Sequence, residues 1–232
     1  MIERRPFATL GRFQNDWLNA RHHFSFASYY DPARMSVGKL RVWNDDQIQA
    51  GTGFDPHPHR DMEIITYVRE GAITHEDSLG NRGRTEAGDV QVMSAGTGIR
   101  HAEYNLEDGP TTLFQIWIEP ARLGVKPRWD AKPFPKGDRA GRWVTLASGR
   151  PDGGDALVIH QDAAVLGATV LAGTRLDYAL GAGRHGYLVA PKGRFTVDGQ
   201  PIEARDGVVL GGGETHRIEA VEDTELVLVD VP

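Results

Sequence analysis

Two stretches of the chain decide its fold: GTGFDPHPHRDMEIITYVREG, from Gly51 to Gly71, and GDVQVMSAGTGIRHAEYN, from Gly88 to Asn105. Both contain short segments rich in Val, Ile and aromatic or alternating polar residues, bounded by glycines. This pattern is typical of β-strands joined by tight turns. Apolar residues at the i, i+3, i+4 spacing of a helix are scarce throughout the chain.

The same pattern extends over the rest of the sequence. The 28 glycines and 13 prolines indicate many turns, and turn signals such as Leu79-Gly80-Asn81 and Asp206-Gly207 recur at short spacing. A length of 232 residues allows one large domain or two small ones, at about 150 residues per domain. We therefore expect an all-β protein with two antiparallel β-barrel domains in tandem.

A Pro-rich, basic segment marks the expected connection between the two domains. Pro127, Pro133 and Pro135 lie in it and cannot donate a hydrogen bond within a central strand. We place the domains at residues 1–125 and 142–232, with the connection at 126–141. A faint internal repeat, in which Tyr67–Gly71 resembles Tyr187–Gly193, supports two related domains.

Composition excludes several classes of function. The chain has 32 acidic and 26 basic residues, a formal charge of −6 and no block of five or six like charges, so direct nucleic-acid binding and a polybasic membrane role are not expected. The absence of cysteine excludes disulfides, iron–sulfur clusters and thiol nucleophiles. The first residues lack the apolar core of a signal peptide, and no stretch is apolar enough to span a membrane, so we expect a cytoplasmic protein.

Two pairs of potential metal ligands stand out among the nine histidines and the acidic residues. They are His57-Pro58-His59 and His101-Ala102-Glu103, both at i, i+2 spacing. Residues two apart on a strand point to the same face, so two adjacent strands can direct four donor atoms to one point. Three imidazoles and one carboxylate suit a first-row divalent metal, and octahedral coordination leaves two positions for substrate and dioxygen or water.

The residues around these pairs resemble a known superfamily. The glycines, the spacing of His57, His59 and Glu63, and the later Gly88, Ser94-Ala95-Gly96 and His101 resemble the paired motifs of cupins. Two departures, a longer step to the second histidine motif and its His-x-Glu, point to one subfamily. Four stretches are similar to the pirin family: HHFSFASYYDP (His22–Pro32), LRVWNDD (Leu40–Asp46), HPHRDMEIITYV (His57–Val68) and DVQVMSAGTGIRHAEYN (Asp89–Asn105).

The resemblance is dense from about residue 12 to 120 and thin afterwards. It implies a bicupin of two double-stranded β-helix (jelly-roll) barrels, with one metal in the N-terminal barrel held by His57, His59, His101 and Glu103. Iron(II) is the usual metal of this family, with zinc, manganese, nickel, cobalt or copper as alternatives. Aligning Gly193 with Gly71 puts Ala179 and Gly181 at the positions of the first histidine pair, so the C-terminal cupin is expected to be degenerate and metal-free.

The closest similarity is to bacterial pirin-like quercetinases. It implies a quercetin 2,3-dioxygenase that opens a flavonol or a related dihydroxylated aromatic with dioxygen, with Glu103 also taking the substrate proton. The alternative is a non-enzymatic, metal- or redox-sensing regulator that acts through a protein partner. A zinc-dependent sugar-isomerase-like cupin would share the ligand types but not the pirin motifs.

Several other residues have two interpretations. Glu63 occupies the acidic position of the general cupin motif and is either a fifth ligand or a group that supports the ligands, although the pirin resemblance gives the role of carboxylate ligand to Glu103. Gln115 shares a strand face with Leu113 and Trp117, and its amide bonds either a ligand histidine or the backbone. We expect packing roles for His22 and His23, and surface or singly bonded roles for four others: His75, His160, His185 and His216.

Overall fold

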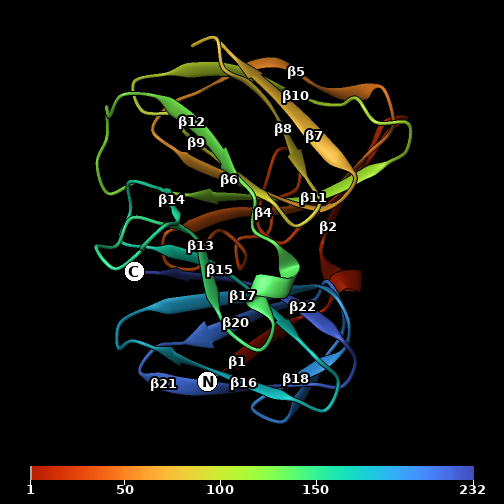
Figure 1. The fold of residues 1–232 in the computed structure, drawn as a ribbon, viewed down its shortest axis with the longest axis vertical. Coiled ribbons are helices and arrows are strands. Elements are labelled where there is room, and N and C mark those ends of the chain that lie inside the picture. Colours follow the sequence, from red (N-terminus) through yellow and green to blue (C-terminus); the bar gives the residue numbers. More distant parts are fainter. Residues whose placement is uncertain (1) are drawn as a thin grey trace.

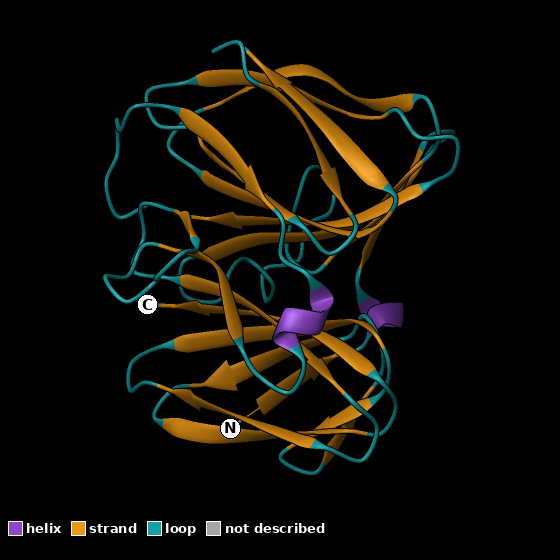
Figure 2. Ribbon diagram, in the orientation of Figure 1, coloured by secondary structure: helices purple, strands orange, loops and turns teal. Residues whose placement is uncertain are grey.

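The computed structural model describes residues 2–232, which form twenty-two strands and two short 3-10 helices, η1 (Phe7–Thr9) and η2 (Lys136–Arg139). Figure 2 shows how little of the chain is helical. Neither helix in this part of the chain has the length or the apolar character needed to cross a membrane. The strands form two stacked sandwiches, one above the other in Figure 1, each built from a seven-stranded and a four-stranded sheet. The expected all-β bicupin architecture is confirmed.

The first sandwich contains most of the N-terminal half. Its large sheet has the order β12-β9-β6-β11-β4-β3-β2, and its small sheet has the order β5-β10-β7-β8. The strands are β2 (Gly11–Gln14), β3 (Leu18–His22), β4 (Leu40–Ile48), β5 (Thr52–His59), β6 (Glu63–Glu70), β7 (Ala72–Asp77), β8 (Arg82–Glu86), β9 (Val90–Ser94), β10 (Ile99–Asn105), β11 (Thr111–Ile118) and β12 (Arg128–Lys132).

The second sandwich repeats this plan. Its large sheet has the order β1-β20-β17-β22-β15-β13-β14, and its small sheet has the order β16-β21-β18-β19. The strands are β1 (Ile2–Arg5), β13 (Val144–Ser148), β14 (Leu157–Val158), β15 (Ala164–Val170), β16 (Arg175–Leu180), β17 (His185–Lys192), β18 (Phe195–Val197), β19 (Gln200–Ile202), β20 (Gly207–Gly211), β21 (Glu214–Ala220) and β22 (Thr224–Val231).

The faint repeat in the sequence has a physical counterpart. Gly71 and Gly193 both adopt positive φ, at +74° and +86°, after the central strands β6 and β17. A Cβ atom at either position would lie within 2.6 Å of a threonine Oγ1, that of Thr111 or Thr224. Both turns therefore require glycine, because any side chain would be strained and would also collide with the start of a neighbouring strand, β11 after Gly71 and β22 after Gly193.

Two segments lie outside the simple division of the chain at residue 125. The first strand, β1, pairs with β20 and so belongs to the sheet of the second half. In Figure 1 the N-terminus accordingly lies beside the C-terminal strands. Within the expected connection at 126–141, β12 is an edge strand of the first sandwich, flanked by Pro127 and Pro133. Proline is compatible with such an edge because no ladder hydrogen bond is lost there.

The residues that face into the first barrel are polar at mid-height. Along β6, Ile64 and Val68 belong to separate small apolar clusters and Thr66 lies between them. Along β11, Gln115 lies in the same way between Leu113 and Trp117. Together with Gln91 and Glu103, these side chains place a buried polar zone inside the first barrel. The second barrel instead has a continuous apolar core.

Candidate metal centre

The pairing of β5 with β10 positions the two ligand pairs. His101 stands opposite His57 and Ile99 opposite His59, whereas Glu103 stands opposite Phe54. The register shift between His101 and Glu103 means that β5 carries one more residue than β10 at this point. Such a bulge twists the strand locally and redirects its side chains.

Three of the four expected ligands converge. The ring centroids of His57, His59 and His101 lie 4.5–5.0 Å apart, and one nitrogen of each lies within 4.8 Å of the others. His57 Nδ1 lies 2.7 Å from the carbonyl oxygen of Asp55 and donates to it, so Nε2 keeps its lone pair. His59 packs edge-to-face on Trp117 at 5.0 Å, which fixes its ring plane.

The surroundings keep the imidazoles of His59 and His101 neutral. Burial, followed by the charges of His101 and His57, lowers the pKa of His59 to about 4. Burial, followed by the charges of His57 and His75, lowers the pKa of His101 to about 3. Both rings therefore carry lone pairs at neutral pH, which is the form that binds metal ions.

One atom shows that a divalent transition metal suits this cluster. His101 Nε2 is buried and has no hydrogen-bond partner. A buried nitrogen lone pair without a partner is costly, and bonding to a metal ion would satisfy it. Because all three converging donors are imidazole nitrogens, the cluster matches first-row divalent metals rather than Mg²⁺ or Ca²⁺.

Glu103 is the fourth expected ligand, and neighbouring amides hold its carboxylate. Oε1 accepts hydrogen bonds from Gln91 Nε2 at 2.6 Å and Thr66 Oγ1 at 3.2 Å, and Oε2 accepts one from Gln115 Nε2 at 2.8 Å. Glu103 groups with His101 and His75 rather than with all three converging imidazoles. Gln115 therefore contacts the carboxylate of an expected ligand, Glu103, and not a ligand histidine.

His75 and Asp77 belong to the same interior, which the sequence did not suggest. His75 Nε2 lies 3.0 Å from Asp77 Oδ2, and His75 Nδ1 lies 3.4 Å from His101 Nδ1. The expectation of a surface or singly bonded His75 is wrong, because the residue is 1% exposed and contacts two polar groups. The i, i+2 pair His75-x-Asp77 is the only sequence signal that could have found it.

Glu63 points away from the cluster. It lies on the opposite face of β6 from Ile64 and Thr66 and accepts a hydrogen bond from Ser94 Oγ at 2.6 Å. His160 of the second half lies 3.3 Å from its other oxygen. Among the described residues, Glu63 joins no group of potential metal ligands.

The remaining histidines have structural partners or are exposed. His22 bonds Asn44 and His23 bonds Tyr187, each at 2.8 Å, in agreement with packing roles. His185 is exposed. In the second barrel, the expectation of a surface or singly bonded His216 is wrong, because the residue is fully buried and uses both ring nitrogens, on Asp198 and on the Gly211 carbonyl.

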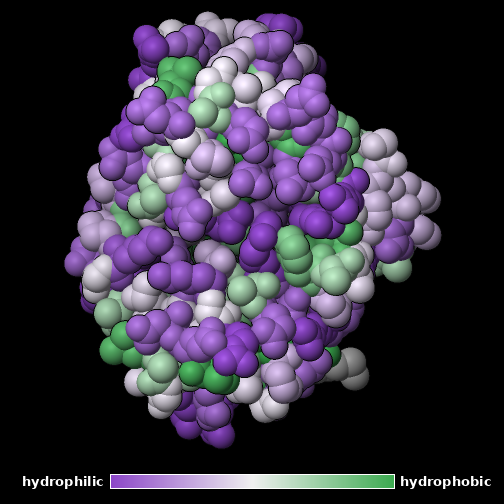
Figure 3. Space-filling view, turned by 90° about the vertical axis from the view of Figure 1, so that its right-hand side faces the viewer, coloured by the Kyte–Doolittle hydropathy of each residue, from purple (hydrophilic) through white to green (hydrophobic). Residues whose placement is uncertain are grey.

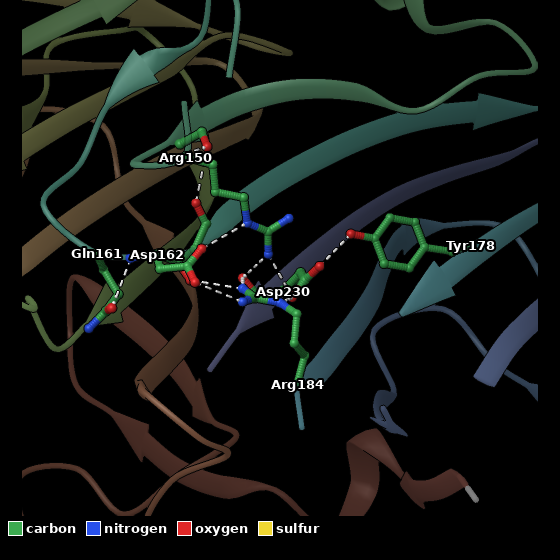
Figure 4. Close-up of polar contacts among 8 residues, drawn as sticks. Arg150, Gln161, Asp162, Tyr178, Arg184 and Asp230 are labelled. Atoms are coloured by element: carbon green, nitrogen blue, oxygen red, sulfur yellow. Dashed lines mark hydrogen bonds and ion pairs between the residues drawn. The ribbon is translucent and has the colours of Figure 1, made fainter. Parts of the chain in front are cut away.

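The second barrel has a network of charged side chains near its large sheet, which is the sheet that faces the first barrel. Tyr178 of β16 stands opposite His216, as His57 stands opposite His101 in the first barrel. Its hydroxyl donates to Asp230 at 2.7 Å, and Arg150 and Arg184 bind the other oxygen of that carboxylate (Figure 4). The hydroxyl, the carboxylate and the two guanidinium groups of this network therefore have one another as hydrogen-bond and ion-pair partners.

Comparisons with known proteins agree with the fold and the site. Residues 4–118 match the model of the family described as Pirin, and residues 145–231 match the quercetinase C-terminal cupin domain. A pirin-like protein of Caulobacter vibrioides is 63% identical over 230 residues, which cover 99% of both chains. A quercetin 2,3-dioxygenase of Escherichia coli strain K12 is 40% identical over 233 residues, covering 100% of this chain and 99% of that protein.

Solved structures point the same way. The bacterial pirin YhhW of Escherichia coli, solved in complex with nickel(II), superposes with a TM-score of 0.93 at 40% identity, covering 100% of this chain and 99% of that one. The fold and the imidazole cluster define a bicupin with its candidate metal centre in the N-terminal barrel. Within that class, the chain belongs to the pirin family.

Proposed function

We propose that this protein is a metal-dependent dioxygenase of the quercetinase type. The observation that carries the proposal is the convergence of His57, His59 and His101, one nitrogen of each lying within 4.8 Å of the others. His101 Nε2 has no hydrogen-bond partner, and Glu103 groups with the same histidine. The Escherichia coli relative named quercetin 2,3-dioxygenase aligns over the whole chain, which supports the same reaction class. The reaction is the opening of the central ring of a flavonol by dioxygen, with release of carbon monoxide.

His57, His59, His101 and Glu103 would hold the ion, for which we propose iron(II). When bound, such an ion supplies Lewis acidity to the substrate oxygens and a path for electrons to dioxygen. The three imidazoles contribute neutral donors, so the ion keeps most of its positive charge for the substrate. The carboxylate of Glu103 contributes the single negative charge of the set.

We also propose that Glu103 takes the proton of the substrate hydroxyl. Its three hydrogen-bond donors leave one of about four carboxylate lone-pair positions free. A carboxylate ligand is a weak base, so this proton transfer requires partial dissociation from the ion or an intervening water. Gln91 and Gln115 hold the carboxylate in place while it does so.

A hollow on the surface touches one of the three converging histidines. A hollow of about 440 Å³ borders His59 and is lined by Arg60 and Arg100, among others. This volume lies within the range of pockets that bind small molecules.

Oxygen uptake tests the proposal. Protein purified without oxygen, loaded with iron(II) and given quercetin should consume dioxygen, with metal content counted in parallel. His57→Ala with His101→Ala should lose both the metal and the uptake. His216→Ala, which removes the buried histidine of the second barrel, should retain both. About one bound metal per chain without uptake, for quercetin and for a panel of dihydroxylated aromatics, would contradict the proposal.

The Glu103→Gln variant separates the two roles of the carboxylate. The amide keeps the shape of the side chain but is a much weaker base and carries no charge. We expect turnover to fall by at least a hundredfold, while quercetin binding, followed by its absorbance shift, changes far less. Equal losses of binding and turnover would argue against a base at this position.

A further inference from the structure

Three side chains, each in contact with the next, lead from the candidate metal centre to the end of strand β7 in the first barrel. Asp77 and His75 lie on β7, and His101 lies on the neighbouring strand β10. The distances are 3.0 Å from Asp77 Oδ2 to His75 Nε2 and 3.4 Å from His75 Nδ1 to His101 Nδ1. The side chains of Asp77 and His75 are both 1% exposed or less.

The contacts of Asp77 determine which atom donates and which accepts in each hydrogen bond between these side chains. Its Oδ1 accepts from the backbone N–H groups of Leu79 and Asn81, at 2.9 and 3.1 Å, and its Oδ2 accepts from Asn81 Nδ2 at 2.9 Å. The carboxylate therefore acts only as an acceptor, and His75 Nε2 must carry a hydrogen. His75 Nδ1 then has a lone pair, to which His101 Nδ1–H donates. The lone pair of His101 is left on Nε2, the buried atom that has no partner.

Packing holds His75 in this orientation. The indole of Trp129, on the edge strand β12, stacks on its ring at a centroid distance of 4.8 Å and an interplanar angle of 8°. Gly83 of β8 stands opposite His75 and makes room for that indole, because a Cβ there would collide with the Trp129 ring. The ring of His75 therefore lies between Trp129 and His101 with both nitrogens engaged.

We propose that Asp77 and His75 are positioning residues that set the tautomer and ring orientation of His101, so that its Nε2 faces the metal. This inference rests on the metal centre of the proposed function. Hydrogen bonds of this kind to a ligating histidine typically change metal affinity ten- to a hundredfold when they are removed. His75 itself is not a ligand in this arrangement, because Asp77 and His101 occupy its two nitrogens.

Asp77→Asn is the sharpest test. The backbone N–H groups of Leu79 and Asn81 require an oxygen at Oδ1, so the new amide nitrogen takes the position of Oδ2 and donates to His75 Nε2, while the side-chain amide of Asn81 turns over to present its oxygen to that nitrogen. The tautomer of His75 is then reversed, Nδ1 becomes a donor, and His101 must place its hydrogen on Nε2. The side chain is otherwise the same shape. His75→Phe tests the same link by a second route, since it keeps the stack on Trp129 and removes both nitrogens.

The second barrel offers a matched control. Asp198 binds His216 at 2.8 Å and also accepts from a backbone N–H, that of Arg217. Asp198→Asn therefore perturbs a similar aspartate–histidine pair that lies far from the imidazole cluster in sequence and in the other barrel.

Cobalt(II) is the probe, with its affinity measured by titration and its visible d–d spectrum recorded for each protein. We expect Asp77→Asn and His75→Phe to bind cobalt ten- to a hundredfold more weakly, with an altered spectrum, and Asp198→Asn to match the unsubstituted protein. Thermal unfolding of the metal-free proteins monitors folding separately.

Three results would overturn the inference in different ways. Equal affinity and spectra in all four proteins would refute the positioning role while leaving the metal centre intact. Loss of one nitrogen ligand in His75→Phe with no change in Asp77→Asn would make His75 a ligand instead. Absence of cobalt binding by the unsubstituted protein would refute the proposed metal centre itself, and the inference with it.

Discussion

His59 and His101 are prepared for metal binding by the groups that surround them. Burial is the main cause of their low pKa values, and the neighbouring imidazoles add to it. A free histidine is half-protonated near pH 6.5, where it would lose metal to protons. With pKa values of about 4 and about 3, these two rings remain ligands well below that pH.

The same shifts make the stability of the metal-free protein depend on pH. Between pH 6.5 and about 4 the unfolded chain binds protons at these two histidines and the folded chain does not, so the free energy of unfolding falls as the pH is lowered through this window. We expect the double variant His59→Gln with His101→Gln to show a shallower fall between pH 7 and pH 5 in urea unfolding. Replacement of the exposed His185 by Gln should leave the dependence unchanged, and equal slopes in all three proteins would contradict the assignment.

Single residues differ in how far sequence could predict them. His57, His59, His101 and Glu103 were found because each pair lies two apart on a strand, a relation that is visible in one dimension. His75 was missed because its contact with His101 crosses between neighbouring strands. For Gln115 the sequence suggests a ligand histidine or the backbone as partner, but the amide donates to Glu103, because the side chain that it meets lies twelve residues away on another sheet.

At the scale of elements, the first strand crosses from one half of the chain to the other. β1 forms four register pairs with β20 and then leads into η1 and the first sandwich. Asp206, just before β20, secures the crossing: its oxygens accept from Arg4 Nε and from the backbone N–H groups of Phe7 and Glu203. The sequence Ile2–Arg5 has no alternation that marks a strand, and its partner lies about two hundred residues away, so no local pattern predicts this pairing.

Replacing Asp206 should reveal how much this crossing contributes. Asp206 is 2% exposed, and Asp206→Ala would leave two backbone donors and Arg4 without their acceptor. We expect a loss of about 2–3 kcal/mol in the free energy of unfolding, measured by urea denaturation. Asp162→Ala removes a carboxylate that is 66% exposed at the rim of the Arg150–Arg184 network, and it should cost less than about 1 kcal/mol. Similar losses in the two variants would show that the crossing adds no special stability.

At the scale of the whole molecule, the two barrels share one apolar core. Phe114 and Ile116 of β11 and Trp43 of β4 pack against Tyr187 and Val229 of the second half. The rings of Trp43 and Tyr187 lie 5.6 Å apart across this interface. The molecular face in Figure 3 is mostly hydrophilic, with hydrophobic residues in small separate groups. The apolar pattern along the chain predicts the strands themselves. It does not predict that one face of the first large sheet packs against one face of the second.

A shared core implies that the two halves unfold together. Ile218 of β21 lies inside the second barrel, away from the interface, and is fully buried. Ile218→Ala should cost about 2–5 kcal/mol. In a Trp143→Phe background, the remaining four tryptophans all belong to the part of the chain that forms the first sandwich, so their fluorescence reports on the first barrel and, through Trp43, on its interface with the second.

We expect this fluorescence transition in urea to coincide with the circular dichroism transition, and both to shift to lower denaturant in Ile218→Ala. Val158→Ala, at a half-exposed position in β14, should move neither. If the fluorescence midpoint stayed in place while the circular dichroism curve split into two steps, the barrels would be independent units. Coincident shifts would mean instead that the second barrel, though it has none of the converging imidazoles, stabilises the one that holds the candidate metal centre.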